Sequence, residues 1–66
     1  MKVKINGKYE EVGSALNIEG LLTSKGLSCE RVVVEHNRRI IPKEEIGAIA
    51  LKEDDDLEIV SFVGGG

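Results

Sequence analysis

The last apolar segment of the chain, Leu57-Glu58-Ile59-Val60-Ser61-Phe62-Val63, is the strongest indication of how the chain folds. Its β-branched and aromatic residues are typical of a β-strand, in which successive side chains point to opposite faces. Leu57 and Ile59 therefore share one face, which we expect to pack against a helix. Val60 and Phe62 fall on the other face. The pattern thus predicts a strand with a buried face and an outer face that still carries apolar side chains.

A β-hairpin is predicted at the start of the chain. Residues 2–5 alternate polar and apolar side chains, and Asn6-Gly7 is a strong signal for a two-residue turn. Residues 8–12 would return as the second strand. The apolar residues of this hairpin then share one face; they are Val3, Ile5 and Val12. Glu10 falls on that face too, so we expect it at the rim of the sheet.

One main helix follows the hairpin. Asn17 is a good N-cap for a helix that begins at Ile18, and Gly26 is a typical residue just beyond a helix C-terminus. Ile18, Leu21 and Leu22 recur at helical spacing and give the helix one apolar face. Gly20 lies inside this helix and weakens it, so packing must stabilise it.

The middle of the chain predicts shorter elements. Residues 31–36 are rich in valine and are typical of a central strand, Asn37-Arg38 is a candidate turn, and residues 39–41 form a short strand that Pro42 ends. Residues 43–46 favour a single helical turn with Pro42 at its start. The acidic residues 54–56 indicate a turn before the last strand, and we expect this turn to be solvated.

This order of elements predicts an α+β fold of the β-grasp type, in which a mixed sheet of four to five strands wraps over one main helix. The first and last strands would lie side by side at the centre of the sheet. Sixty-six residues make a single domain. We assign residues 1–63 to this domain and residues 64–66 to a flexible C-terminal tail.

Composition excludes several classes of function. The chain has 9 Lys plus Arg and 12 Asp plus Glu, a net charge of -3, which argues against binding to nucleic acid. Its longest apolar run is far too short to span a membrane.

A single cysteine, Cys29, excludes an internal disulfide, and we expect a cytoplasmic protein that is monomeric when free. So small a domain also leaves little room for an enclosed active site, so we do not expect an enzyme.

The strongest functional signal is the run Gly64-Gly65-Gly66. Glycine adds no packing and has the largest backbone entropy, so it is a poor end for a folded domain. A tail without side chains is useful where a chain must thread into a narrow site. Gly64 and Gly65 would then form the thread, and the carboxylate of Gly66 would be the reacting group.

Other polar residues favour structural roles. His36 has no second histidine or cysteine beside it, so a hydrogen-bonded strand histidine is favoured over a metal ligand. Residues 54–56 lack the spacing of a calcium loop, and we expect no bound metal. Cys29 is far in sequence from the tail, which favours a partly buried structural thiol over a redox partner.

The whole chain resembles the thiamine-biosynthesis sulfur carrier proteins, the ThiS family of ubiquitin-like β-grasp proteins. The resemblance is carried in order by Asn6, Leu21-Leu22, His36-Asn37, Ile41-Pro42, Glu53-Asp54-Asp55, Leu57-Glu58-Ile59-Val60 and the terminal Gly65-Gly66. Two positions depart from the family pattern. Asp54 stands where the family usually has glycine in the acidic turn, and Arg38 stands where glycine often follows the asparagine. Aspartate tolerates a left-handed backbone, so the acidic turn should survive.

The resemblance implies a sulfur carrier rather than a catalyst. A ubiquitin-activating-like adenylyltransferase (ThiF-like) would use Mg-ATP to adenylate Gly66, although the carrier itself binds no cofactor. A sulfur donor such as a cysteine desulfurase would convert the adenylate to a thiocarboxylate, and a ThiG-like thiazole synthase would take the sulfur. We expect Val60 and Phe62 to dock on both enzymes.

Two alternatives remain open from the sequence. The first keeps the chemistry but changes the pathway to molybdopterin, cysteine or tRNA thiolation. The second is a β-grasp interaction module that has no reactive tail.

Overall fold

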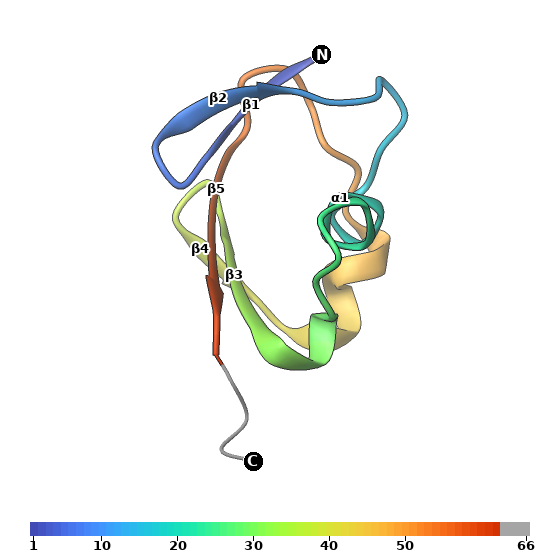
Figure 1. Cartoon of the computed structure of the whole chain (residues 1–66), viewed down its shortest axis with the longest axis vertical. Coiled ribbons are helices and arrows are strands. Elements are labelled where there is room, and N and C mark those ends of the chain that lie inside the picture. Colours follow the sequence, from blue (N-terminus) through green and yellow to red (C-terminus); the bar gives the residue numbers. More distant parts are fainter. Residues whose placement is uncertain (63–66) are drawn as a thin grey trace.

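A five-stranded mixed sheet forms one layer of the protein in the computed structural model, which describes residues 1–62. The strands lie in the order β2-β1-β5-β3-β4. In chain order the elements are β1 (Lys2–Ile5), β2 (Lys8–Glu11), α1 (Ile18–Ser24), the 3₁₀ helix η1 (Cys29–Arg31), β3 (Val32–His36), β4 (Arg39–Ile41), the 3₁₀ helix η2 (Lys43–Ala48) and β5 (Asp56–Ser61). Figure 1 shows α1 and η2 on the same side of the sheet. The β-grasp arrangement predicted from the sequence is therefore present.

Both hairpins close through turns whose central residues have positive φ. Asn6 and Gly7 have φ of 51° and 86° in the first turn, and Asn37 and Arg38 have φ of 49° and 72° in the second. Two positive φ values in succession match the twist of the flanking strands and let them pair without splaying. Both turns were predicted. The conformational cost is larger for Arg38 than for Asn37, because a long side chain disfavours the left-handed region that asparagine and glycine adopt readily.

The last strand, β5, is the centre of the sheet. It pairs in parallel with β1, with Ile5 beside Leu57, and antiparallel with β3, with Val34 beside Ile59. The first and last strands are thus neighbours, as predicted. Leu57 and Ile59 are buried in the core. Because β5 has a partner on each side, its position is fixed by hydrogen bonds from both halves of the chain.

The helix α1 begins and ends where its sequence predicts. The side chain of Asn17 accepts a hydrogen bond of 2.7 Å from the Gly20 N–H, which satisfies one of the free donors of the first turn. After the last turn Gly26 has φ of 72°, and the Leu27 N–H donates to the Leu22 carbonyl at 2.8 Å. Such a left-handed residue closes the helix C-terminus.

The hydrophobic core lies between the sheet and the helical layer. Its buried residues come from every strand except β2, from α1 and η2, and from the segment before β5: Val3, Ile5, Ile18, Leu21, Leu22, Val32, Val34, Ile41, Ile46, Leu51, Leu57 and Ile59. Val12 packs against this cluster, as the hairpin pairing predicts. Within residues 1–62, no helix is both long and apolar enough to cross a membrane.

Candidate functional site

Across β3, β4 and β5, the outer face of the sheet carries four exposed apolar side chains. Val60 and Phe62 are 61% and 49% exposed on the β5 segment, as the alternation of this strand predicts. Val33 of β3 lies directly opposite Val60, and Ile40 of β4 lies opposite Glu35, two residues further along β3. Val33 and Ile40 are also exposed. We call Val33, Ile40, Val60 and Phe62 the outer apolar patch.

Sequence reasoning found only half of this patch. The run Val32-Val33-Val34 is apolar throughout, which is typical of a strand buried on both faces. In the structure Val32 and Val34 are buried and Val33 is exposed. Strict alternation along β3 was the available signal for Val33. To place Ile40 on the outer face, one must know the register of β4 against β3, and a single sequence does not give this register.

The end of β5 is hydrogen-bonded up to Phe62 on its β3 side and up to Ile59 on its β1 side. On the β3 side, the Phe62 N–H donates to the Arg31 carbonyl at 3.0 Å. On the β1 side, the Asn6 side chain makes the two hydrogen bonds to Ile59 that the backbone of a neighbouring strand would otherwise make. Its Oδ1 accepts from the Ile59 N–H at 2.8 Å, and its Nδ2 donates to the Ile59 carbonyl at 3.2 Å. Asn6 therefore both forms a turn and extends the pairing of β5 beyond β1.

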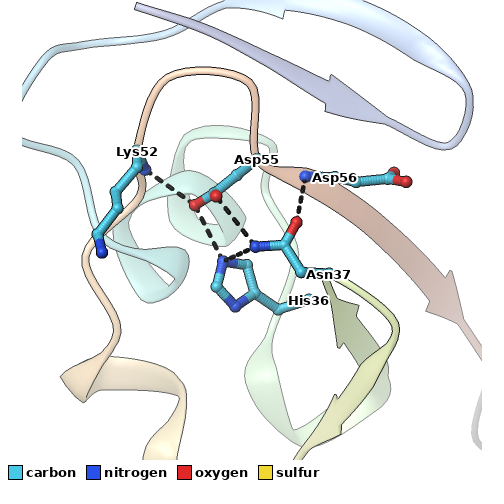
Figure 2. Close-up of polar contacts among 5 residues, drawn as sticks. All are labelled: His36, Asn37, Lys52, Asp55 and Asp56. Carbon is cyan, nitrogen blue, oxygen red and sulfur yellow. Dashed lines mark hydrogen bonds and ion pairs between the residues drawn. The ribbon is translucent and has the colours of Figure 1, made fainter.

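A buried carboxylate fastens the acidic turn to the β3–β4 hairpin (Figure 2). Asp55 is only 7% exposed. Its Oδ2 lies 2.9 Å from His36 Nε2 and accepts from the Lys52 N–H at 2.9 Å, and its Oδ1 accepts from Asn37 Nδ2 at 3.1 Å. The Oδ1 of Asn37 in turn accepts from the Asp56 N–H at 2.9 Å. The expectation of a solvated turn is therefore wrong for Asp55, because three hydrogen-bond partners compensate for its burial.

This network sets the charge state of Asp55. Burial alone would raise the pKa of the carboxyl, but hydrogen bonds from His36, Asn37 and the Lys52 N–H outweigh it and lower the pKa below the ordinary 3.8. An ionised carboxylate only accepts hydrogen bonds, so His36 carries its proton on Nε2. His36 is thus a hydrogen-bonded strand histidine, as predicted. The positive φ of Asp54, 69°, also agrees with the expectation that aspartate replaces glycine in this turn.

The remaining predicted residues divide into two groups. Cys29 is a half-buried free thiol in η1, which agrees with the structural interpretation. In the part of the chain that the structure describes, no three His, Cys, Asp or Glu side chains are grouped as a metal site would require. Gly64, Gly65 and Gly66, the predicted thread and reacting group, lie outside the described residues, as does the predicted boundary at residue 63.

Comparison with known proteins places this arrangement in a family. The model of the ThiS family matches residues 3–66, which is nearly the whole chain. The chain belongs to the ThiS family. The sulfur carrier protein ThiS of Bacillus subtilis is 47% identical over 68 residues, an alignment that covers 97% of this chain and 98% of that protein. A crystal structure of the thiamine biosynthesis protein ThiS from Geobacter metallireducens superposes with a TM-score of 0.83 at 33% identity, with full coverage of both chains.

Longer relatives of the ThiS family also match. Thiazole synthases of Magnetococcus marinus and Paramagnetospirillum magneticum are each 39% identical over 66 residues. The whole of this chain aligns with them, but it spans only 20% of their length. These two proteins therefore contain a ThiS-like region within a larger chain.

Proposed function

We propose that this protein is a sulfur carrier for the thiazole ring of thiamine. The observation that carries the proposal is the family match, which includes the glycine-rich end and extends to Gly66. The Bacillus subtilis relative has almost the same length and is named a sulfur carrier. A carrier of this kind is a co-substrate of other enzymes and needs no catalytic residues of its own.

The proposed chemistry takes place at the carboxyl group of Gly66. A carboxylate oxygen of Gly66 attacks the α-phosphate of Mg-ATP in the partner adenylyltransferase, and pyrophosphate leaves. Sulfide or an enzyme persulfide, supplied by a donor such as a cysteine desulfurase, then attacks the acyl carbon and displaces AMP. Release from the persulfide enzyme requires a second thiol, which reduces the resulting disulfide. Gly64 and Gly65 keep the thread narrow, because a Cβ at either position would widen it and restrict its backbone.

The proposed acceptor of the sulfur is a thiazole synthase. Two proteins of that name contain a region similar to this whole chain, which supports a direct partnership between the two kinds of domain. The adenylyltransferase would be a ThiF-like member of the ubiquitin-activating class. Both enzymes would act on the same tail in turn, so both need to recognise the domain that presents it.

The outer apolar patch is the proposed docking surface for these enzymes. Val60 and Phe62 lie at the end of β5, next to the tail, and Val33 and Ile40 widen the surface across β3 and β4. Complete burial of a Phe side chain contributes roughly 1.5–3 kcal/mol. Phe62 is already half-buried, so docking would return about half of this, or roughly 0.8–1.5 kcal/mol.

Intact-protein mass spectrometry tests the proposed function. The purified protein is incubated with the cognate adenylyltransferase, Mg-ATP and sulfide. We expect the mass to rise by the difference between one sulfur and one oxygen, with the change located at Gly66 by fragmentation. A protein that consumes ATP but never gains sulfur would contradict the proposal. Transfer of the sulfur to an acceptor other than thiazole synthase would contradict only the thiamine pathway.

A matched pair of aromatic substitutions tests the docking surface. Phe62→Ala should weaken binding to each enzyme by about five- to tenfold, which corresponds to roughly 1–1.4 kcal/mol. Tyr9→Ala removes an aromatic side chain of similar exposure from β2, near the far edge of the sheet, and should have little effect. Equal affinities for the two variants, measured by calorimetry, would place the docking surface elsewhere.

A further inference from the structure

One part of the edge of β5 is left uncovered by the neighbouring strand. β1 pairs with β5 only as far as Ile5, which lies beside Leu57. The Asn6 side chain then occupies the N–H and carbonyl of Ile59. β5 continues to Ser61 and extends past the β1–β2 hairpin (Figure 1). The sheet therefore has a gap on this side, next to Ser61.

The backbone of Ser61 points into this gap. The N–H and carbonyl groups of successive strand residues alternate between the two edges of the strand. The Phe62 N–H donates to Arg31 on the β3 side, so the groups of Ser61 face the β1 side. The same alternation directs the carbonyls of Asp55 and Leu57 toward β1, where they accept hydrogen bonds from Lys4 and Asn6. Among residues 1–62, the pairing of β1 with β5 stops at Leu57, and no turn or loop hydrogen bond reaches Ser61 across this edge.

A pocket of about 500 Å³ adjoins the gap. Ile59 and Ser61 line it from β5, Lys8 and Glu10 from the β1–β2 hairpin, and Lys25 from the end of α1. Lys25 Nζ lies 2.8 Å from Glu10 Oε1, so these two charges offset each other. Lys8 is exposed and has no ion-pair partner among the described residues. The pocket therefore carries one uncompensated positive charge beside an open strand edge.

We propose that this notch, formed by the Ser61 edge with Lys8, Glu10 and Lys25, binds an extended segment of the adenylyltransferase. The segment adds to β5 as a further strand through the backbone of Ser61, and one of its acidic side chains pairs with Lys8. Strand addition at an open edge gives affinity through main-chain hydrogen bonds, and the adjoining charge gives specificity. The identity of the partner rests on the proposed function, whereas the notch itself follows from the pairing of β5.

The notch and the outer apolar patch are two separate binding surfaces of the same strand, β5. The patch lies on the outer face of the sheet, whereas the notch opens at an edge of β5. A partner that occupies both fixes the backbone of Ser61 and Phe62 at the point where the chain leaves the sheet. Because both contacts hold this part of the backbone in place, they define the direction from which the tail enters the partner's active site.

Amide hydrogen exchange measured by NMR tests the proposal. In the complex with the adenylyltransferase, the Ser61 amide should exchange at least about tenfold more slowly than in the free protein. The Phe62 amide already donates to Arg31 and should change less. A Ser61 amide that exchanges equally fast in both states, in a complex that still forms the thiocarboxylate, would overturn the notch while leaving the proposed function intact.

Charge-reversal variants provide a second test. Lys8→Glu and Lys43→Glu change the net charge by the same amount, but Lys43 lies on η2, where it pairs with Glu30. Lys8→Glu should weaken binding of the adenylyltransferase about five- to tenfold, and Lys43→Glu should change it by less than about twofold. Equal effects of the two variants would contradict the proposal.

A peptide titration followed by NMR tests the notch independently of the proposed function. It applies also if the protein forms no thiocarboxylate and the proposed function is wrong. The probe is a short peptide of alternating valine and glutamate with blocked ends, and the control has lysine in place of glutamate. A shift of the Ser61 amide signal with the acidic peptide alone would support the notch as a strand-binding site. No shift with either peptide at millimolar concentration would overturn it.

Discussion

Replacing Asp55 with asparagine should destabilise the protein strongly, because no orientation of the amide satisfies all its neighbours. In the native network both carboxylate oxygens accept hydrogen bonds, from the Lys52 N–H and His36 on one side and from Asn37 on the other. An asparagine side chain has one oxygen and one NH₂ group. Whichever way it turns, its NH₂ group faces a donor, and that part-buried hydrogen bond is lost.

The size of the effect follows from these bonds. A polar group left without a partner at this buried position costs about 1–3 kcal/mol, and loss of the charge weakens the hydrogen bonds that remain. We expect Asp55→Asn to lower the free energy of unfolding by about 2–3 kcal/mol. For a domain of this size that corresponds to a fall in Tm of roughly 10–20 °C. Asp54→Asn is the matched control, because Asp54 is exposed and asparagine also tolerates its positive φ.

Urea unfolding followed by far-UV circular dichroism at several pH values provides the assay. The pKa of Asp55 is lower in the folded protein than in the unfolded chain. Its stabilisation is therefore fully present above the ordinary pKa of 3.8 that the unfolded chain retains, and it is lost as the pH falls through the folded pKa. The native protein should be more stable than Asp55→Asn above this pH, and the difference should shrink as the pH falls below it. A difference that grows in acid, or an Asp54→Asn variant that is equally unstable, would refute the reasoning.

Two further substitutions test the backbone and the tail. Arg38→Gly should stabilise the protein by about 0.5–1 kcal/mol, because glycine adopts the positive φ of this turn without strain, whereas Arg39→Gly in β4 should destabilise it; thermal unfolding distinguishes the two outcomes. Gly65→Ala and Gly66→Ala should slow ATP–pyrophosphate exchange by the adenylyltransferase strongly while Tm stays unchanged. Gly13→Ala, where a new Cβ has no neighbour within 4 Å, should leave the exchange rate at its original value.

The local signals in the sequence predicted the local structure well. Asn6-Gly7, Asn17 and Gly26 each favour one backbone geometry, and the structure has the turn, the helix N-cap and the left-handed residue at the positions expected. These signals work because the physical cause lies within a few residues. The alternation of residues 57–62 also predicted which side chains of β5 are exposed, since the strand period is a local property.

Features that depend on distant partners could not be predicted in the same way. The Asn6 side chain bonds to Ile59, which is 53 residues away in the sequence. Asp55 is buried only because the β3–β4 hairpin brings His36 and Asn37 to it. In each case the residue type was noticed, but its role depends on strand order and register. Ile40 was missed from the outer apolar patch for the same reason, whereas Val33 was missed because the run Val32-Val33-Val34 shows no alternation of residue type.

The central position of β5 has a consequence for protein synthesis. The two hairpins β1–β2 and β3–β4 are joined in the sheet only through β5, which pairs with β1 and β3. While a ribosome is still translating the codons before Asp56, neither hairpin has its neighbour, and isolated hairpins are only marginally stable. Cooperative folding must wait until β5 has emerged from the exit tunnel. A nascent chain that stalls before that point would be recognised as unfolded by chaperones and proteases.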